Sequence, residues 1–274
     1  MMEYNCAELK KLALEARKKM LDIGFNSNYA VHFGGGLSSI DLLTYLYQFE
    51  MNYDIKDKFN SERDRFFISK GHGVLSYYVA LFQAGFFGED ILNTFQQNEG
   101  ELSSHPVKNL ELGIEASTGS LGQGLSLAVG NQIYAKRNNK DFKAFVLMGD
   151  GECDEGSVWE AAMFAAHYKL DNIVVIVDHN GLQSDGTNST VMNIEKLCDK
   201  WQSFGWDTYE IDGHSFDEIH DAFSKMVWDN GKPKVIVART IKGKGVSFME
   251  NNNEWHHRVM TEPEYKLAVD ELEG

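Results

Sequence analysis

Cysteine and proline are scarce in this sequence. Its 274 residues include three cysteines and three prolines. The cysteines Cys6, Cys153 and Cys198 form no CxxC pair, and an odd number of scattered thiols is typical of a reducing compartment rather than of a disulfide framework. So few prolines exclude a proline-rich linker, and one compact domain over residues 1–274 is the simplest interpretation.

Long apolar runs and an excess of positive charge are also missing. No segment approaches the roughly 20 apolar residues that span a bilayer, and the N-terminus has no apolar signal core. The chain has 26 Lys and Arg residues against 41 Asp and Glu residues, a net charge of −15. Such acidity disfavours binding to nucleic-acid phosphates or to an anionic membrane face. We therefore expect a cytoplasmic protein with no nucleic-acid or membrane partner.

Several common cofactor and catalytic motifs are absent. The segment Gly119-Ser-Leu-Gly-Gln-Gly124 has the spacing GxxGxG rather than the GxGxxG of a dinucleotide fold, and it lacks the Lys-Ser/Thr of a P-loop. Taken alone, it is explained equally well by a tight turn that packs a helix closely. The absent GxGxxG makes a nicotinamide dehydrogenase unfavoured. No HExxH and no Cys/His spacing of a structural zinc site occurs, and no GxSxG elbow occurs either.

What the sequence does contain is an alternation of apolar, β-branched runs with helical patterns. Strands are predicted over 66–68, 143–148, 172–177, 207–211 and 235–238. Helices are predicted over 6–23 (ending at Gly24), from Ser38 or Ser39, and over 74–84, 88–95, 119–137 (after its first glycines), 157–170, 194–204 and 216–227. A glycine-rich loop is expected at 34–36 and a long loop at 98–113. This alternation predicts an α/β fold with three layers, a mostly parallel sheet with helices on both faces.

Two polar residues follow neighbouring predicted strands. Asp150 ends one apolar run, and Asn180 ends the next one, 30 positions later. Ligands of open α/β sheets collect outside the carboxyl ends of the strands. The two side chains would offer oxygens to a hard cation, and the helix between them would offer its N-terminus to a diphosphate. Either residue alone is explained better as a strand-end cap, but the pair at this interval favours a binding site.

Five histidines lie in predicted loops near glycines or aromatic residues: His32, His72, His105, His256 and His257. A lone loop histidine is usually solvated or structural. His32 and His72, however, adjoin glycine-rich segments at predicted element ends, where sites form. Neutral imidazoles bond phosphate oxygens or sugar hydroxyls and shuttle protons near neutral pH.

A series of short motifs runs along almost the whole chain. They are Ser69-Lys-Gly-His-Gly73, His105-Pro106, Ser117-Thr-Gly-Ser-Leu-Gly-Gln-Gly124, Gly149-Asp-Gly-Glu-Cys-Asp-Glu-Gly-Ser-Val-Trp-Glu-Ala-Ala162, Tyr168-Lys-Leu-Asp-Asn-Ile173, Thr240-Ile-Lys-Gly-Lys-Gly245 and Trp255-His256. From about residue 5 to the end, the sequence resembles the N-terminal, diphosphate-binding part of transketolase. Its Gly-Asp-Gly, followed about 30 residues later by Asn, is the signature of thiamine-diphosphate enzymes.

The resemblance implies a set of cofactor contacts. Asp150 and Asn180 would bind a divalent metal through side-chain oxygens, and Leu182 through its backbone carbonyl. Magnesium is expected, with calcium or manganese as substitutes. Glu155 would lie at a subunit boundary and link paired active sites. The remaining contacts to thiamine diphosphate are expected from His72, Gly119, Ser120, Leu121, Gly151, Lys242 and His256.

The resemblance also implies a reaction and a partner. Transketolases transfer a two-carbon ketol unit from a ketose or ketose phosphate to an aldose or aldose phosphate. The implied catalytic residues are His32, His72, His105 and His256, with His32 and His105 near sugar hydroxyls. The sequence offers no counterpart of the family's pyrimidine-binding and C-terminal domains. We therefore expect the N-terminal subunit of a split transketolase, paired with a C-terminal subunit in an α2β2 heterotetramer.

Some positions depart from the family pattern, and alternatives stay open. Many members have Pro at the positions of Phe33 and Ser120, and Gly at that of His257. The chain could instead be a 2-oxoacid dehydrogenase α subunit, part of a deoxyxylulose-phosphate synthase, or a catalytically silent binding homologue. The His105-Pro106 and 119–124 motifs favour transketolase over the first two. The retained metal and diphosphate residues argue against the third.

Overall fold

A five-stranded parallel sheet forms the centre of the computed structural model, which describes residues 4–274. The strand order is β1-β2-β3-β5-β4, and every neighbouring pair is parallel. The strands are β1 (Arg65–Ile68), β2 (Ala144–Gly149), β3 (Ile173–His179), β4 (Asp207–Asp212) and β5 (Lys234–Arg239). All five predicted strands are therefore confirmed, with ends shifted by at most two residues.

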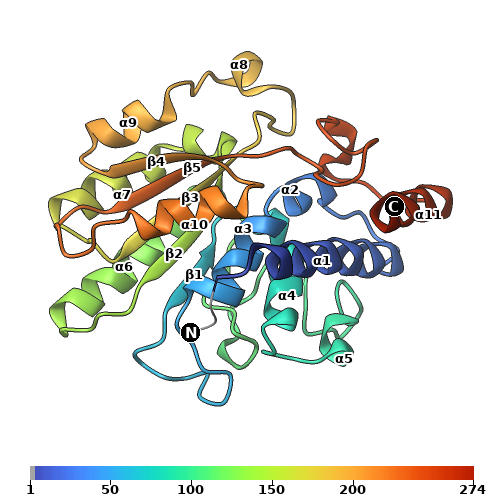
Figure 1. Cartoon of the computed structure of the whole chain (residues 1–274), viewed down its shortest axis with the longest axis horizontal. Helices are drawn as coiled ribbons and strands as arrows, with labels where there is room; N and C mark the ends of the chain where they lie inside the picture. Colours follow the sequence, from blue (N-terminus) through green and yellow to red (C-terminus); the bar gives the residue numbers. More distant parts are fainter. Residues whose placement is uncertain (1–3) are drawn as a thin grey trace.

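The sheet is buried on both faces. Along β2, Phe145 and Leu147 belong to one hydrophobic core, whereas Val146 and Met148 belong to another. Successive side chains of a strand point to opposite faces, so an uninterrupted apolar run needs helices on each side. Figure 1 shows the sheet between two groups of helices. The predicted three-layer α/β architecture is confirmed.

The helices divide between the two cores. One core includes α1 (Cys6–Asn26), α2 (Phe33–Leu37), α3 (Ile40–Tyr45), α4 (Val74–Gln83), α10 (Phe216–Ser224) and α11 (Glu262–Glu273), and the other includes α6 (Gly124–Arg137), α7 (Gly156–His167) and α9 (Leu197–Ser203). The shorter elements are η1 (Leu46–Glu50), η2 (Gly71–Gly73), α5 (Glu89–Leu92), η3 (Leu110–Leu112), η4 (Gly151–Asp154), α8 (Asn188–Val191) and η5 (Asn253–His256). Across residues 4–274, none of these helices combines the length and apolar character needed to cross a membrane.

Two predictions about glycines were wrong. Helix α1 passes through Gly24 and ends at Asn26, and residues 34–36 are helical rather than a loop. A Cβ added to Gly24 would lie 2.5 Å from the ring of Phe33, and one added to Gly36 would lie 2.1 Å from Cε of Met20. The glycines are therefore needed where α1 and α2 pack closely together, and they do not end a helix.

Helix α11 was not predicted. It packs against α1, as Figure 1 shows. The Tyr265 hydroxyl donates to Oδ1 of Asp22 at 2.6 Å, and its ring stacks on Phe25 with centroids 4.4 Å apart. A capping box between Thr261 and Glu264 begins the helix. This Thr-x-x-Glu pattern is a recognised helix start signal, so the sequence did contain the information.

Candidate active site

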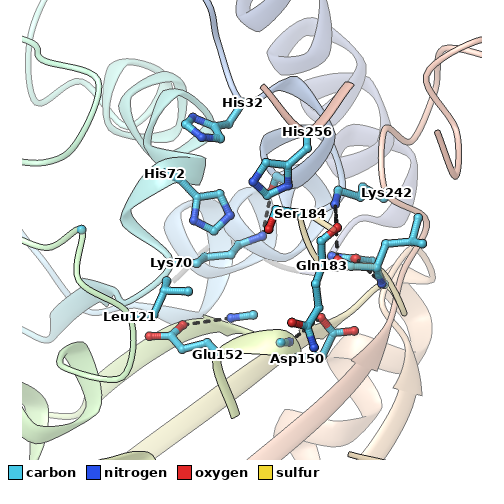
Figure 2. Close-up of a pocket in the computed structure, with 16 residues that line it drawn as sticks. His32, Lys70, His72, Leu121, Asp150, Glu152, Gln183, Ser184, Lys242 and His256 are labelled. Atoms are coloured by element: carbon cyan, nitrogen blue, oxygen red, sulfur yellow. Dashed lines mark hydrogen bonds between the residues drawn. The ribbon is translucent and has the colours of Figure 1, made fainter. Parts of the chain in front are cut away.

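A cavity of about 280 Å³ opens at the carboxyl ends of the strands. The segments that follow β1, β2, β3 and β5 contribute Lys70, Asp150, Asn180 and Lys242 to its lining. Figure 2 shows Asp150 on one side of the cavity, opposite the histidines. Ten predicted site residues line it: His32, His72, Gly119, Leu121, Asp150, Gly151, Asn180, Leu182, Lys242 and His256. The cavity therefore lies at the carboxyl ends of the strands, where the sequence predicted a binding site.

The Asp150 carboxylate is buried and held by four hydrogen-bond partners. Its side chain accepts from the backbone N–H of Gly151 at 2.8 Å and of Gly181 at 2.7 Å. Nδ2 of Asn188 donates to it at 2.8 Å, and Nδ1 of His179 lies 3.1 Å away. The hydrogen bond with Asp150 raises the pKa of His179. These partners fix the orientation of the carboxylate at the end of β2.

The other two predicted metal ligands lie on the turn after β3. Nδ2 of Asn180 donates to Asp178 at 3.2 Å, and its Oδ1 accepts from the N–H of Leu182 at 3.1 Å. The described residues contain no cluster of three or more His, Cys, Asp or Glu side chains suited to a metal. The predicted metal ligands differ from such a cluster, because they combine one carboxylate, of Asp150, with the amide oxygen of Asn180 and the backbone carbonyl of Leu182. Oxygen donors of this kind suit a hard divalent cation.

Lys242 brings a buried positive charge to the cavity. Its Nζ donates to the carbonyls of Leu182 at 3.3 Å and Gln183 at 3.1 Å, and to Oδ1 of Asn253 at 3.3 Å. Burial lowers the pKa of Lys242 to about 8, although the negative charge of Asp150 opposes this shift. The ammonium group therefore lies directly beside one of the predicted metal ligands.

A buried network holds the backbone on both sides of Lys242. Asp41 accepts from Arg17 at 2.5 and 3.0 Å, and lies 2.7 Å from Nδ1 of His214. Nε2 of His214 in turn accepts from the N–H of Ile241 at 2.9 Å, and Nε of Arg17 donates to the carbonyl of Lys244 at 3.2 Å. Burial raises the pKa of Asp41, but His214 and Arg17 outweigh it and lower the pKa overall. No sequence pattern indicated this network.

A second buried ion pair joins Lys70, which lines the cavity, to Asp178. Lys70 and Asp178 are 1% and 0% exposed, and Nζ of Lys70 donates both to Asp178 and, at 2.6 Å, to the carbonyl of Gly35. Asp178 also accepts from Ser38 at 2.6 Å and from Thr240. Burial raises the pKa of Asp178, but the charge and hydrogen bond of Lys70 outweigh it, so the pKa lies below its ordinary value. The pair ties α2 to the ends of β1 and β3.

Glu152 connects the glycine-rich segment to the end of β2. This buried side chain accepts from the N–H groups of Gly122 at 2.8 Å and Gly149 at 3.1 Å, and from the hydroxyl of Ser69. Burial raises the pKa of Glu152. The only sign in the sequence that Glu152 belongs to the site was its position directly after Gly-Asp-Gly. The lining residues that were not predicted as site residues are Gly35, Lys70, Gly149, Glu152, Gln183 and Ser184.

The five loop histidines come together in one cluster. Ring centroids around His32 lie 5.2 Å from His72, 5.3 Å from His256, 6.0 Å from His105 and 4.2 Å from His257. Burial, and then the neighbouring imidazoles, lower the pKa of His32 to about 3. Burial and the charge of Lys242 lower the pKa of His256 to about 4. His32 and His256 are therefore neutral near pH 7, where each of these two rings offers one donor and one acceptor.

The low pKa values of the cluster predict an acid-dependent loss of stability. The unfolded chain, with histidine pKa values of about 6.5, binds protons that folded His32 and His256 do not. The free energy of unfolding should therefore be unaffected by these groups above about pH 6.5 and fall as the pH drops towards 4. Urea unfolding at pH 7.5 and pH 5 measures this fall. In a His32→Gln/His256→Gln variant, the free energy of unfolding should fall less between these two pH values. An unchanged pH dependence in this variant would contradict the explanation.

Three predicted site residues do not line the cavity. Ser120 is exposed, and Glu155 is exposed at the N-cap of α7. His105 lies beside His32 at the edge of the histidine cluster. The predicted roles of Ser120 through its backbone, of Glu155 at a subunit boundary and of His105 towards a sugar remain predictions.

Comparison with known proteins identifies the family. The family model described as "Transketolase, thiamine diphosphate binding domain" matches residues 11–272 of this chain. The chain belongs to the transketolase family. It is 43% identical to one of the subunits of the apulose-4-phosphate transketolase of Actinobacillus succinogenes, over 99% of both chains. It is 40% identical to the 6-deoxy-6-sulfo-D-fructose transketolase subunit SqwG of a Clostridium species, over 99% of this chain and 96% of that one.

Longer transketolases match over part of their length. The crystal structure of Campylobacter jejuni transketolase superposes with a TM-score of 0.91 at 28% identity, over 98% of this chain but 43% of the other. Human transketolase is 34% identical over 37% of its length. The chain thus spans less than half of these transketolases, whereas it matches the transketolase subunits almost from end to end. The family resemblance predicted from the motifs and the thiamine-diphosphate-binding fold are confirmed.

Proposed function

We propose that this chain is the diphosphate-binding subunit of a heteromeric, thiamine-diphosphate-dependent transketolase. The observation that carries the proposal is the match, over 99% of both chains, to a protein that is itself named as one subunit of a transketolase. The reaction would transfer a two-carbon ketol unit from a ketose or ketose phosphate to an aldose or aldose phosphate.

The proposal assigns the parts of a full transketolase to two chains. Residues 1–274 would form one diphosphate-binding domain, and a separate C-terminal subunit would carry the pyrimidine-binding and C-terminal domains. The match to only 43% of the Campylobacter jejuni transketolase supports this division. An α2β2 assembly would suit this division, because the family resemblance implies that each cofactor lies between the diphosphate domain of one copy and the pyrimidine domain of another. We expect the assembly in the cytoplasm.

The residues at the strand ends fit a metal diphosphate. Asp150, Asn180 and Leu182 would bind Mg²⁺, for which Ca²⁺ or Mn²⁺ could substitute. Within residues 4–274, Nδ1 of His256 is buried without a hydrogen-bond partner, which leaves it free for an oxygen of the diphosphate. The Lys242 ammonium adds a positive charge at the same place. The oxygen ligands would bind the hard cation, and His256 and Lys242 would bind the anionic oxygens of the diphosphate.

Glycines keep the walls of the cavity open. A Cβ added to Gly35 would lie 3.4 Å from Nε2 of His72, and one added to Gly119 would lie 3.2 Å from Cδ2 of His105. A side chain at Gly119 would press on the His105 ring, whereas a Cβ at Gly35 would only touch His72. The segment that holds Gly119 and Leu121 would then lie along the middle of the cofactor, and Ser120 would contribute only its backbone.

The protein's own part in the reaction is orientation and proton handling. Thiamine diphosphate, when bound, supplies the carbanion chemistry. His32 and His105 would hydrogen-bond sugar hydroxyls, and His72 and His256 would lie beside the diphosphate. Because burial lowers the pKa values of His32 and His256, these rings stay neutral and both donate and accept hydrogen bonds. Neutral rings orient a polyhydroxyl substrate without adding charge.

A thermal-shift measurement tests the cofactor assignment. Thiamine diphosphate with Mg²⁺ should raise the Tm of this chain mixed with its partner subunit, because ligands that bind only the folded state stabilise it by mass action. At 100 times the Kd, the stabilisation is about 2.7 kcal/mol. NAD should cause no shift, and a shift with NAD alone would overturn the proposal. A shift without ketol transfer from xylulose 5-phosphate to ribose 5-phosphate would favour a silent homologue.

A further inference from the structure

The turn that carries Lys242 follows β5 and packs on α2. Gly243, the next residue, has a φ of +81°, and its N–H donates to the carbonyl of Gly34 in α2 at 2.9 Å. A Cβ at Gly243 would lie 2.3 Å from the carbonyl oxygen of Met249, so the turn needs glycine here. Lys242 extends from inside this turn into the cavity of the proposed site. The place of its ammonium group therefore depends on how the two ends of the turn are held.

Two side chains hold the ends of the turn, and both are bound to one carboxylate. At the start, Nε2 of His214 accepts from the N–H of Ile241 at 2.9 Å. At the end, Nε of Arg17 donates to the carbonyl of Lys244 at 3.2 Å. His214 and Arg17 both contact Asp41, a residue of α3 that is 5% exposed. A single buried group of α3 therefore fixes both ends of the turn.

The hydrogen bond with Ile241 decides where the proton of His214 lies. A backbone N–H only donates, so Nε2 of His214 must be the unprotonated, accepting nitrogen. Nδ1 then carries the ring proton and donates it to Asp41, 2.7 Å away. The carboxylate thus holds the imidazole in the tautomer that Ile241 needs. Both nitrogens of His214 have partners within the protein, so the ring positions other groups and does not react itself.

We propose that His214 is a positioning residue for the binding of thiamine diphosphate, and that it acts by fixing the turn that carries Lys242. The inference rests on the proposed function, in which the Lys242 ammonium lies beside the diphosphate. In Figure 2 this ammonium lies at the edge of the cavity, where it donates to the carbonyl of Gln183. A charge-assisted hydrogen bond to a phosphate oxygen weakens when its donor moves out of line. Loss of the bond between His214 and Ile241 therefore weakens cofactor binding without changing a group that reacts.

Three substitutions of His214 in the complete two-subunit enzyme separate its two hydrogen bonds. In His214→Gln, Oε1 reaches the place of Nε2 and accepts from the N–H of Ile241. In His214→Asn, the shorter amide keeps the contact with Asp41 but leaves that N–H unpaired. His214→Ala and His214→Asn should raise the Kd for thiamine diphosphate about tenfold, the cost of one hydrogen bond, whereas His214→Gln should stay within about threefold of wild type. Isothermal titration calorimetry of the cofactor-free enzyme at saturating Mg²⁺ measures the Kd.

Two further readouts separate positioning from a general loss of structure. Hydrogen exchange of the Ile241 N–H should be fast in His214→Ala and His214→Asn and slow in His214→Gln, because only Gln keeps an acceptor for it. At saturating cofactor, kcat for ketol transfer should remain within about twofold of wild type in all three variants, because Lys242 would touch the diphosphate and not the reacting carbons.

His220→Ala is a matched histidine control. His220 lies on α10, hydrogen-bonds Tyr45 at 3.0 Å and does not line the cavity that Lys242 lines. Its substitution should leave both the Kd and the exchange of the Ile241 N–H unchanged. Equal Kd values for the Gln and Asn variants of His214, or a Kd raised as much by His220→Ala as by His214→Ala, would overturn the positioning role. Absence of thiamine diphosphate binding by the wild-type enzyme would instead refute the proposed function itself.

Discussion

Asp150→Ala is expected to abolish thiamine-diphosphate-dependent ketol transfer by the two-subunit enzyme, with a loss of well over 100-fold. Asp150 is the only carboxylate of the proposed metal-ligand set, and it is 2% exposed. Loss of even an outer-shell partner of a metal site typically costs 10–100-fold in metal affinity or activity, and loss of a direct ligand costs more. The rate of ketol transfer, measured from xylulose 5-phosphate to ribose 5-phosphate at saturating Mg²⁺, checks the loss.

Two further variants separate a metal effect from a folding effect. Asp150→Asn keeps the size of the side chain but removes its charge, so it should raise the Mg²⁺ concentration needed for half-maximal activity. Asp171→Ala removes an aspartate just before β3, at the amino ends of the strands and so away from the cavity. There its carboxylate accepts from the N–H of Gly231 at 2.9 Å. It should leave the Mg²⁺ dependence unchanged. Full activity of a folded Asp150→Ala variant would refute the assigned metal site.

Asp178→Asn is expected to lower the free energy of unfolding by about 3–5 kcal/mol, because it leaves the buried Lys70 ammonium without its counter-charge. Lys70 is 1% exposed. Since the pKa of Asp178 is depressed in the folded protein, its stabilisation is present above the unfolded pKa of about 4 and is lost as the pH falls through the folded value. The difference between wild type and variant should thus be constant near neutral pH and shrink below about pH 4. Urea unfolding of both proteins at several pH values measures it.

A double variant tests whether the loss of stability comes from leaving one charge of the Lys70–Asp178 pair unpaired. Lys70→Met/Asp178→Leu should cost less than the sum of the single changes, because it leaves neither charge unpaired. The control is the exposed pair of Asp221, on α10, and Lys225, just after that helix, with side chains 65% and 69% exposed. Asp221→Asn should change stability by less than about 0.5 kcal/mol. Strict additivity of the two buried changes, or a cost at Asp178 as small as at Asp221, would refute the account.

The strands and the strand-end residues could be predicted from the sequence because both are local patterns. Short continuous apolar runs, each followed by a polar turn, identify buried strands and their carboxyl ends. Asp150 and Asn180 are found in this way without any knowledge of contacts. The family motifs then add Leu182 and Lys242, which no periodicity marks.

The residues that brace the site could not be predicted because their partners are remote in sequence. Lys70 and Asp178 are 108 positions apart, and Asp41 and His214 are 173 apart. A buried charge looks the same in the sequence as a solvated one, and only the fold decides which it is. The helical glycines are a similar case, since Gly36 has a packing role that depends on Met20 in another helix.

A continuous-variation assay tests most directly whether this chain is one half of a transketolase. The total concentration of this chain plus the protein encoded beside it is kept constant while their ratio is varied, with thiamine diphosphate and Mg²⁺ in excess. Ketol transfer should be near zero when either protein is alone and maximal at an equimolar ratio. A maximal rate with this chain alone would contradict it.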